Sequence, residues 1–374
     1  MAIRVLYLHH VKQISGAENS LLLLFRNLDR SQIVPMFAGP AVGPFPDALI
    51  KENIPVFPIP FGRLRNLGGL ARSVRSLGKL IRDRDIDLIH SNGPQTNVCA
   101  GIAGRLNNRP VVWHTRNLLE RGMWDVDRTA AGLASRIICN SEAIRNRFRG
   151  SKAWKKSVTI LNAVDTREFS LQVNREDFRR EMELPPGVPA IGIVGRIGTG
   201  KGHEYFLDAA IKLLHTGTIA QFLIVGAPLF AEDAWRVDVL RRRVQEAHYE
   251  ECIRFTGLRR DMPQVMRGLD VLVLASDAEP CGRVLFEAMA SGTAIVATNS
   301  GGTPEIVRHG QEGLLVPPRD SEALASAIGR MVTDPQLQAS LGRNGVLRAQ
   351  REFTVERYVA RTLDVYAQVT LSVW

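Results

Sequence analysis

The chain has 374 residues, too many for one ordinary domain and enough for two or three that each bury a core. Its 45% hydrophobic and 23% charged residues argue against disorder, and no apolar run approaches the ~20 residues of a membrane span. The first apolar run is too short for a signal peptide, so we expect a cytoplasmic protein. Four scattered cysteines argue against a disulfide framework and a structural zinc site: Cys99, Cys139, Cys252 and Cys281.

The formal net charge of +10 belongs to one half of the chain. Residues 1–187 carry 28 basic and 17 acidic side chains, a net charge of +11, whereas residues 188–374 carry 20 and 21, a net charge of −1. A basic excess is typical of proteins that bind nucleic acid, anionic membranes or phosphorylated substrates. The asymmetry is a first indication that the two halves are organised separately.

Short apolar and β-branched runs alternate with helical patterns along the first half. The predicted strands cover residues 4–8, 34–38, 56–59, 88–90, 111–113, 137–139 and 158–161. The predicted helices between them cover residues 17–28, 69–82, 95–106 and 141–148. A cluster of proline and glycine at residues 182–190 then indicates a linker.

The same alternation restarts after the linker. The predicted strands cover residues 191–194, 221–225, 253–255, 271–275, 294–297 and 314–316, and the helices cover 201–214, 231–247 and 282–290. Residues 321–372 read as helical, and their last segment is expected to cross back to the first domain. Alternation of this kind predicts an α/β protein with two doubly wound domains facing a cleft, and ligands outside the carboxyl ends of the strands.

The first candidate site follows the strand at 191–194. The segment from Gly195 to Gly202 nearly spells a phosphate-binding Walker A loop, but Gly202 stands where a magnesium-binding Ser or Thr belongs. It does not spell a nicotinamide fingerprint either. A glycine-rich turn remains, with Arg196 and Lys201 beside a helix N-terminus, which suits a diphosphate. A solvated turn would explain it equally well.

Two further candidate sites follow later strands. Glu279 and Glu287 suggest a glycosidase pair, but on one helix they would lie ~12 Å apart, beyond the ~5–9.5 Å that such pairs require. They could equally hold sugar and ribose hydroxyls, or Glu287 could be an ordinary solvated residue. Gly301 and Gly302 offer backbone N–H groups to an anion before a helix start at Thr303, although a structural turn is an equal explanation.

In the first half, Gly16 follows the first strand and permits close approach to a ligand. His114 comes after the strand at 111–113, and its place at a sheet's carboxyl edge favours a function over the commoner structural role. His90, ending another strand, is the less favoured neighbour.

A basic helix and a basic cluster add to this half. At ~100° per residue, Arg72, Arg75, Lys79 and Arg82 share one helix face, and an apolar face opposite them is expected to pack on the sheet. That apolar face consists of Leu67, Leu70, Val74, Leu77 and Ile81. Trp154 lies within six basic residues and suits a membrane interface: Arg145, Arg147, Arg149, Lys152, Lys155 and Lys156.

Together, the Glu-x7-Glu pair, the loop at 195–202 and Gly301-Gly302-Thr303-Pro304-Glu305 resemble the motifs of the retaining glycosyltransferases of family four. The resemblance runs through nearly the whole chain and is strongest over residues 190–320. It implies the GT-B fold, with two Rossmann-like domains: an acceptor-binding domain at 1–184 and a nucleotide-sugar-binding domain at 185–354. Residues 355–374 would be the helix that crosses back.

The resemblance also implies roles for individual residues. The catalytic groups would be His114, Glu279, Arg196 and Lys201. The donor diphosphate would contact Gly16, Gly195, Arg196 and Lys201, and Glu287 would bind the ribose. Glu279 and His114 would contact the sugar. Backbone amides at the helix start after Glu279 would bind the sugar and the phosphates: Gly282, Arg283, Val284 and Leu285. The nucleotide base would lie near Gly257 and Leu258, after the strand at 253–255.

The implied activity is transfer, with retention, from a UDP-sugar or GDP-mannose to a hydroxyl of a lipid-linked or glycan acceptor in bacterial-type envelope synthesis. No metal or further cofactor is expected, because the nucleotide sugar is a co-substrate. The basic helix face of Arg72, Arg75, Lys79 and Arg82, together with Trp154 in its basic cluster, suggests that the first domain docks on the cytoplasmic side of an anionic membrane. A sugar-nucleotide epimerase and a basic nucleic-acid-binding protein are the alternatives, although no nucleic-acid motif is present.

Overall fold

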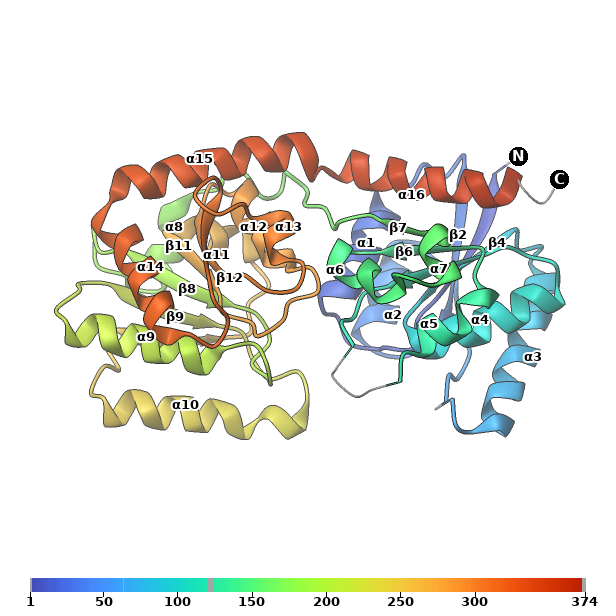
Figure 1. Ribbon diagram of the computed structural model, residues 1–374, viewed down its shortest axis with the longest axis horizontal. Helices are drawn as coiled ribbons and strands as arrows, with labels where there is room; N and C mark the ends of the chain where they lie inside the picture. The colour runs from blue at the N-terminus through green and yellow to red at the C-terminus, as the bar shows by residue number, and fades with distance from the viewer. Residues whose placement is uncertain (1, 63, 120–123, 372–374) are drawn as a thin grey trace. The chain divides into compact units, whose positions relative to one another are not determined.

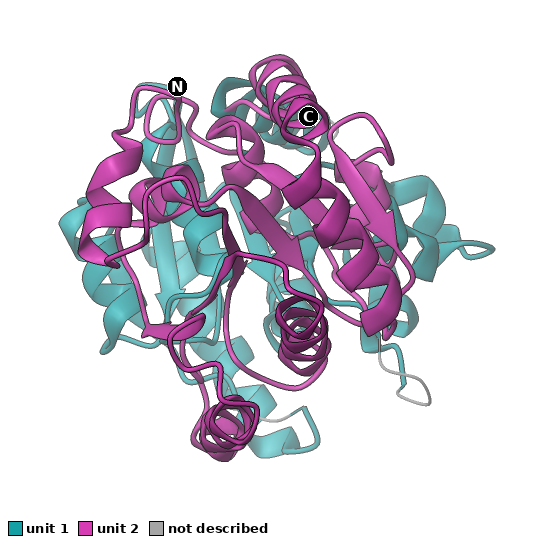
Figure 2. Ribbon diagram, turned by 90° about the vertical axis from the view of Figure 1, so that its left-hand side faces the viewer, with its two compact units in different colours: residues 1–163, 355–374 teal, residues 164–354 magenta. Residues whose placement is uncertain are grey.

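The structure is a computed structural model that describes residues 2–62, 64–119 and 124–371. The chain divides into two α/β units, which are coloured separately in Figure 2. Unit 1 comprises residues 1–163 and 355–374, and unit 2 comprises residues 164–354. Among the described residues, no helix combines the length and apolar character that crossing a membrane requires.

Unit 1 contains a seven-stranded parallel sheet in the order β3-β2-β1-β4-β5-β6-β7 (Figure 1). Its strands are β1 (Ile3–Leu8), β2 (Ile33–Gly39), β3 (Val56–Pro58), β4 (Leu88–Asn92), β5 (Val111–Thr115), β6 (Arg136–Cys139) and β7 (Ser157–Thr159). Alternate residues of a strand face opposite sides, so Val5 and Tyr7 enter one apolar core and Leu6 and Leu8 enter another. Both faces of the sheet are therefore covered, as parallel sheets require.

The helices of unit 1 divide between these two cores. They are α1 (Gly16–Arg26), α2 (Pro44–Lys51), α3 (Leu67–Asp83), α4 (Pro94–Leu106), α5 (Val126–Ala130), α6 (Glu142–Arg145), α7 (Lys152–Lys156) and α16 (Val355–Thr370). The first core contains residues of α1, α2 and α16, and the second contains residues of α3 and α4. The last helix of the chain thus completes the core of the first unit.

Unit 2 contains a six-stranded parallel sheet in the order β10-β9-β8-β11-β12-β13. Its strands are β8 (Ala190–Val194), β9 (Gln221–Val225), β10 (Ile253–Gly257), β11 (Val271–Leu274), β12 (Ala294–Thr298) and β13 (Gly313–Val316). Its helices are α8 (Arg175–Glu181), α9 (His203–His215), α10 (Trp235–Glu246), α11 (Met262–Gly268), α12 (Arg283–Ala290), α13 (Thr303–Ile306), α14 (Ser321–Thr333) and α15 (Pro335–Glu352).

The boundary between the units lies at 163/164, earlier than the 184/185 expected from the linker composition. Residues 164–184 belong with unit 2 because α8 packs against it and is bound to it by ion pairs. Arg175 and Arg179 bind the Asp270 carboxylate at 2.7 and 3.1 Å, and Phe178 packs against Gly268. The proline- and glycine-rich stretch that read as a linker is therefore a loop inside unit 2.

Candidate active site

The topology of unit 2 brings two loops together at one edge of the sheet. β8 has β9 on one side and β11 on the other, so the chain order reverses beside β8. Such a switch point is where open α/β sheets bind ligands, outside the carboxyl ends of the strands. The loop of residues 195–202 follows β8, and the loop of residues 275–282 follows β11.

Lys201 and Glu279 meet at this switch point. Lys201 Nζ donates to Glu279 Oε2 at 2.7 Å, and the Ser276 hydroxyl donates to the same oxygen at 3.1 Å. The backbone N–H of Asp277 also donates to the carbonyl of Gly200 at 2.9 Å, which joins the two loops directly. Two residues expected from the sequence to act on one ligand are thus held side by side.

Two glycines make this close approach possible. Gly202 has a φ of +73°, and a Cβ there would lie 1.9 Å from the carbonyl oxygen of Ala275. Gly301 has a φ of +56°, and a Cβ there would lie 2.2 Å from the carbonyl oxygen of Glu279. Any side chain would therefore push the loops apart. The Gly302 N–H donates to the Glu279 carbonyl at 2.8 Å. We expected this N–H to be open to an anion, but it holds the Glu279 loop in place.

Arg196 is held by a different partner from Lys201. It binds the Asp233 carboxylate at 3.1 Å, and its guanidinium lies over the Phe230 ring at 5.3 Å. Asp233 also accepts from Arg236 at 3.0 Å. Arg196 therefore has to exchange or share an ion pair if it is to contact a diphosphate.

Glu287 is the fifth of the eight residues of α12, and only 6% of the residue is exposed. It accepts from Arg283 at 2.8 Å, one helical turn earlier. This is the ion pair that residues four apart on a helix can form, and it gives the buried carboxylate a partner of opposite charge. Gly282 is the N-cap of α12, and Arg283, Val284 and Leu285 form its first turn.

Other expected positions of unit 2 lie at the same sheet edge. Gly257 ends β10, and its carbonyl accepts from the N–H of Gly226, which follows β9. Leu258 is largely exposed, as a residue must be if it is to cover a ligand. Gly195 follows β8 directly and has a φ of +148°.

His203 was missed by the sequence analysis. It begins α9 directly after Gly202, is buried, and has no hydrogen-bond partner at either ring nitrogen among the described residues. Burial, with the nearby cations Lys201 and Arg196, lowers its pKa to about 4. It is therefore a neutral imidazole at the base of the glycine loop. The sequence shows that His203 directly follows the glycine loop, but it does not show that the side chain is buried.

Unit 1 places a second polar cluster at the carboxyl edge of its own sheet. His114 is the fourth residue of β5 and His90 the third of β4, so both lie inside strands and not beyond their ends. Both are buried, and Arg116 lies 3.1 Å from His114 Nδ1. Gly16 begins α1, as expected for a residue after the first strand.

His9 and Glu18 belong to the same edge and were not expected. His9 Nε2 lies 2.5 Å from Glu18 Oε1, and the Ser15 hydroxyl donates to Glu18 Oε2 at 2.6 Å. Burial raises the pKa of Glu18, but the hydrogen bonds from His9 and Ser15 outweigh it and lower that pKa to about 2. Glu18 is thus a fixed negative charge at the start of α1.

Models of two protein families match most of the chain. Glycosyl transferases group 1 matches residues 188–334, and glycosyltransferase family 4 matches residues 14–168. A lipopolysaccharide core biosynthesis mannosyltransferase of Rhizobium leguminosarum is 34% identical over 275 residues, 68% of this chain and 77% of that protein. The chain belongs to the family 4, group 1 glycosyltransferases.

This glycosyltransferase has further relatives of known name. The UDP-Gal:alpha-D-GlcNAc-diphosphoundecaprenol alpha-1,3-galactosyltransferase of Escherichia coli is 24% identical over 99% of this chain and 98% of its own. The lipopolysaccharide core mannosyltransferase LpsB of Rhizobium meliloti is 28% identical, and the match covers 56% of this chain and 60% of that protein. The crystal structure of Anabaena HepE with UDP superposes with a TM-score of 0.87 at 27% identity, covering 98% and 100% of the two chains. The fold is therefore GT-B.

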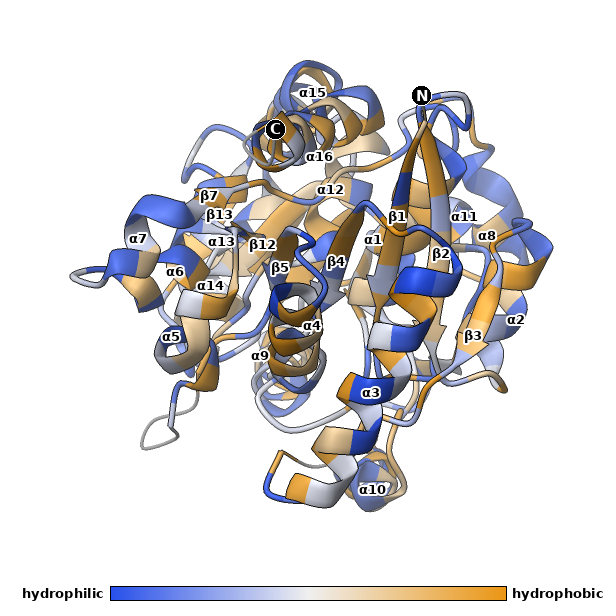
Figure 3. Cartoon of the chain, turned by 90° about the vertical axis from the view of Figure 1, so that its right-hand side faces the viewer, coloured by the Kyte–Doolittle hydropathy of each residue, from blue (hydrophilic) through white to orange (hydrophobic). Residues whose placement is uncertain are grey.

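The basic face of the glycosyltransferase lies on α3 of unit 1. Arg72, Arg75, Lys79 and Arg82 are all exposed, and hydrophobic and hydrophilic residues alternate along this helix in Figure 3. By sequence, unit 1 carries 26 basic and 13 acidic residues, and unit 2 carries 22 and 25. The structural boundary therefore sharpens the charge asymmetry to +13 against −3.

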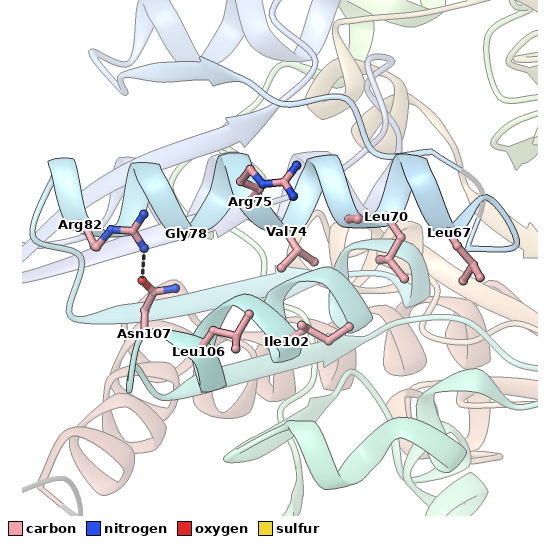
Figure 4. Close-up of a pocket in the computed structure, with 10 residues that line it drawn as sticks. Leu67, Leu70, Val74, Arg75, Gly78, Arg82, Ile102, Leu106 and Asn107 are labelled. Atoms are coloured by element: carbon pink, nitrogen blue, oxygen red, sulfur yellow. Dashed lines mark hydrogen bonds between the residues drawn. The ribbon is translucent and has the colours of Figure 1, made fainter.

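The apolar face of α3 packs against the core on one side of the sheet except at its first residue. Leu77 and Ile81 are buried, and Leu70 and Val74 pack against the same core while partly exposed. Leu67 is 75% exposed, so the expectation for this face fails at that residue. Leu67, Leu70 and Val74 line a pocket of about 470 Å³ with Ile102 and Leu106 of α4 (Figure 4).

Basic residues stand at the rim of this pocket. Arg75 and Arg82 line it, and Arg82 donates to the side chain of Asn107 at 2.8 Å. Trp154 lies elsewhere in unit 1, on α7, half-buried under the Arg145 guanidinium at 4.1 Å. Arg147 is bound to Asp125 at 2.6 Å. Several side chains of the cluster around Trp154 thus make contacts within unit 1. Among the basic residues of the α3 face, Arg82 makes such a contact, and Arg72, Arg75 and Lys79 make no ion pair or hydrogen bond with another described residue.

Proposed function

We propose that this glycosyltransferase is a retaining enzyme that transfers a sugar from a nucleoside diphosphate sugar to a hydroxyl of a lipid-linked or glycan acceptor in envelope glycan synthesis. The observation that carries the proposal is the Lys201–Glu279 pair at the switch point of unit 2. A cation for a diphosphate and a carboxylate for sugar hydroxyls are placed there next to each other. Glu287 is the corresponding carboxylate for the ribose.

The chemistry needs charge stabilisation more than a nucleophile. The acceptor oxygen attacks the anomeric carbon from the face that the diphosphate leaves. The bond from that carbon to the diphosphate oxygen breaks, and the acceptor's proton passes to the departing diphosphate. Lys201, Arg196 and the first N–H groups of α12 stabilise the developing negative charge. In this scheme the protein residues bind and orient the donor and the acceptor, and no metal ion takes part.

The names of the relatives support a particular substrate class. HepE was solved with UDP and with UDP-glucose, and the Escherichia coli relative is named for a UDP-sugar and a diphosphoundecaprenol acceptor. The pocket between α3 and α4 has the composition that a lipid-linked acceptor or an anionic membrane requires, an apolar floor with arginines at its rim. We therefore propose a UDP-sugar as donor and unit 1 as the surface that meets the lipid at the cytoplasmic face.

The test has two stages. A thermal-shift screen over UDP, GDP and ADP identifies the base, with UDP expected to stabilise the protein most. Product analysis by NMR then follows the matching nucleotide sugar with and without a polyprenyl-diphosphate-linked acceptor. An axial anomeric linkage from an axial donor supports retention. A changed sugar configuration without acceptor would instead indicate an epimerase.

A further inference from the structure

A chain of buried hydrogen bonds ends at His114 in unit 1. The Tyr366 hydroxyl of α16 lies 2.5 Å from His90 Nδ1 and 3.0 Å from the Tyr7 hydroxyl. His90 Nε2 lies 3.3 Å from His114 Nδ1, and the two rings are stacked with centroids 5.4 Å apart. All four side chains are buried, so bulk water does not replace these partners. The last helix is thereby connected to the edge of the sheet.

The Arg116 guanidinium fixes which ring nitrogens carry protons. Its Nη2 lies 3.1 Å from His114 Nδ1, and a guanidinium can only donate. His114 Nδ1 is therefore the accepting nitrogen, and the ring proton is on Nε2. His90 donates its own Nε2–H to the same acceptor, which leaves His90 Nδ1 to accept from Tyr366. The Tyr366 hydroxyl has one proton, which it shares between His90 Nδ1 at 2.5 Å and the more distant Tyr7 oxygen at 3.0 Å. The three contacts are consistent with one arrangement of protons.

Neither imidazole takes up a second proton readily. Burial lowers the pKa of His114 well below its ordinary value, and Arg116 and His90 lower it further. Burial, together with Arg116, lowers the pKa of His90 to about 3. His114 Nε2 is buried and has no hydrogen-bond partner among the described residues. Buried donors of this kind are rare without a partner, so this N–H is the one that a ligand would satisfy.

We propose that Tyr366 and His90 are positioning residues that hold His114 as the Nε2–H tautomer. The inference rests on the proposed function and on the role that the family resemblance implies for His114, which is contact with the transferred sugar. His114 then gives a hydrogen bond to a sugar oxygen and does not act as a base toward the acceptor. The proton of the acceptor is left to the departing diphosphate.

The tautomer can be read directly by NMR. The full chain is deuterated and labelled with ¹⁵N-histidine, and long-range ¹H–¹⁵N spectra are recorded without substrate. The signals of His114 and His90 are assigned from their loss in His114→Gln and His90→Gln. We expect both rings to be neutral with the proton on Nε2 between pH 6 and 8. A His114 ring protonated on Nδ1, or on both nitrogens, would overturn the proposal.

A matched pair of variants tests the contribution of the last helix. Tyr366→Phe removes only the hydroxyl, and we expect the His90 Nδ1 resonance to shift and kcat to fall about three- to tenfold, the equivalent of one hydrogen bond. Tyr358→Phe is the control, because Tyr358 is buried on the same helix and its hydroxyl has no partner among the described residues. Unchanged His90 resonances in Tyr366→Phe would contradict the proposal. Since the spectra need no activity, a failed transfer assay would count only against the proposed function.

Discussion

The Lys201 ammonium lies 2.7 Å from the Glu279 carboxylate, although the two residues are 78 positions apart in the chain. The contact is direct, and the loops that carry the two residues are joined through the Asp277 N–H and the Gly200 carbonyl. Without a diphosphate, Glu279 neutralises Lys201. A bound diphosphate would take over the ammonium and release the carboxylate to the sugar.

Replacing Lys201 by alanine should reduce kcat/KM for sugar transfer about 10²- to 10³-fold, because one placed charge at the leaving group is lost. Glu287→Ala should weaken nucleotide-sugar binding through the ribose. Steady-state kinetics measures both effects, and circular dichroism shows whether each variant is folded. Near-normal turnover by a folded Lys201→Ala/Glu287→Ala double variant would refute the assignment.

Replacing Glu279 by glutamine should separate binding from turnover. The competing carboxylate is removed from Lys201, so UDP should bind at least as tightly as before, while transfer falls because a contact to the sugar is lost. Calorimetric titration with UDP and a transfer assay measure the two quantities. Asp277→Asn is the control, since it changes the same charge in the same loop but lies against Arg319. Weaker UDP binding in Glu279→Gln alone would contradict this account.

Two glycines of one loop allow steric conflict to be separated from backbone strain. Gly200 and Gly202 both have φ values near +74°, but a Cβ at Gly200 meets nothing within 4 Å, whereas one at Gly202 lies 1.9 Å from the Ala275 oxygen. Gly200→Ala should lower the free energy of unfolding by about 1 kcal/mol, and Gly202→Ala by about 3 kcal/mol. Urea unfolding measures the difference. Equal costs would show that the loop shifts enough to relieve the steric conflict at position 202.

The buried ring of His203 should make the protein less stable in mild acid. Its pKa is lowered to about 4 in the folded state, against about 6.5 in the unfolded chain. Below pH 6.5 the unfolded chain therefore binds a proton that the folded chain does not, and stability falls. Between pH 6.5 and 5 this loss is about 1.5 kcal/mol.

His203→Leu should remove that part of the pH dependence of unfolding, which denaturant titrations at several pH values would detect. His215 is exposed at the other end of α9, so His215→Leu is the matched control and should keep the wild-type dependence. A wild-type dependence in His203→Leu would show that other groups cause the acid sensitivity.

The face on α3 should govern binding to anionic vesicles. Arg72→Glu/Arg75→Glu reverses two exposed charges, and co-sedimentation with phosphatidylglycerol vesicles at low salt should fall at least tenfold, since each basic residue near such a surface contributes about 1 kcal/mol. Arg242→Glu/Arg343→Glu makes the same change at exposed positions of unit 2 and should have little effect. Equal binding by all three proteins, or none by the wild type, would count against membrane docking.

Sequence periodicity identified every strand that the structure describes, because buried parallel strands are continuous apolar runs, as at 222–225. It ended β4 and β5 two residues too early, since their last residues are polar: Ser91 and Asn92 in one, His114 and Thr115 in the other. These residues are buried all the same, because the carboxyl edge of a sheet in this fold is where polar groups gather. Hydropathy alone could not distinguish such an edge from a loop.

The sequence predicts the residues of the candidate site but not their contacts. The motifs gave Lys201, Glu279 and Glu287 because their spacing is characteristic, whereas the partners of Arg196 and the burial of His203 depend on the loops around them. The apolar face of α3 was recognised from its period. The sequence did not show what lies against that face, because periodicity indicates which residues share one side of a helix but not what packs against them.

The helix α16 has a consequence for synthesis of the chain. Domains usually fold in the order in which they leave the ribosome. Here the strands of unit 1 emerge first, but Val365, Tyr366 and Val369 of its core are made only after residues 164–354 are complete. Unit 2 is therefore the first part able to finish folding. Until then this face of the nascent unit 1 sheet is covered only by α1 and α2. Loss of the last helix would leave the rest of the face permanently exposed to aggregation.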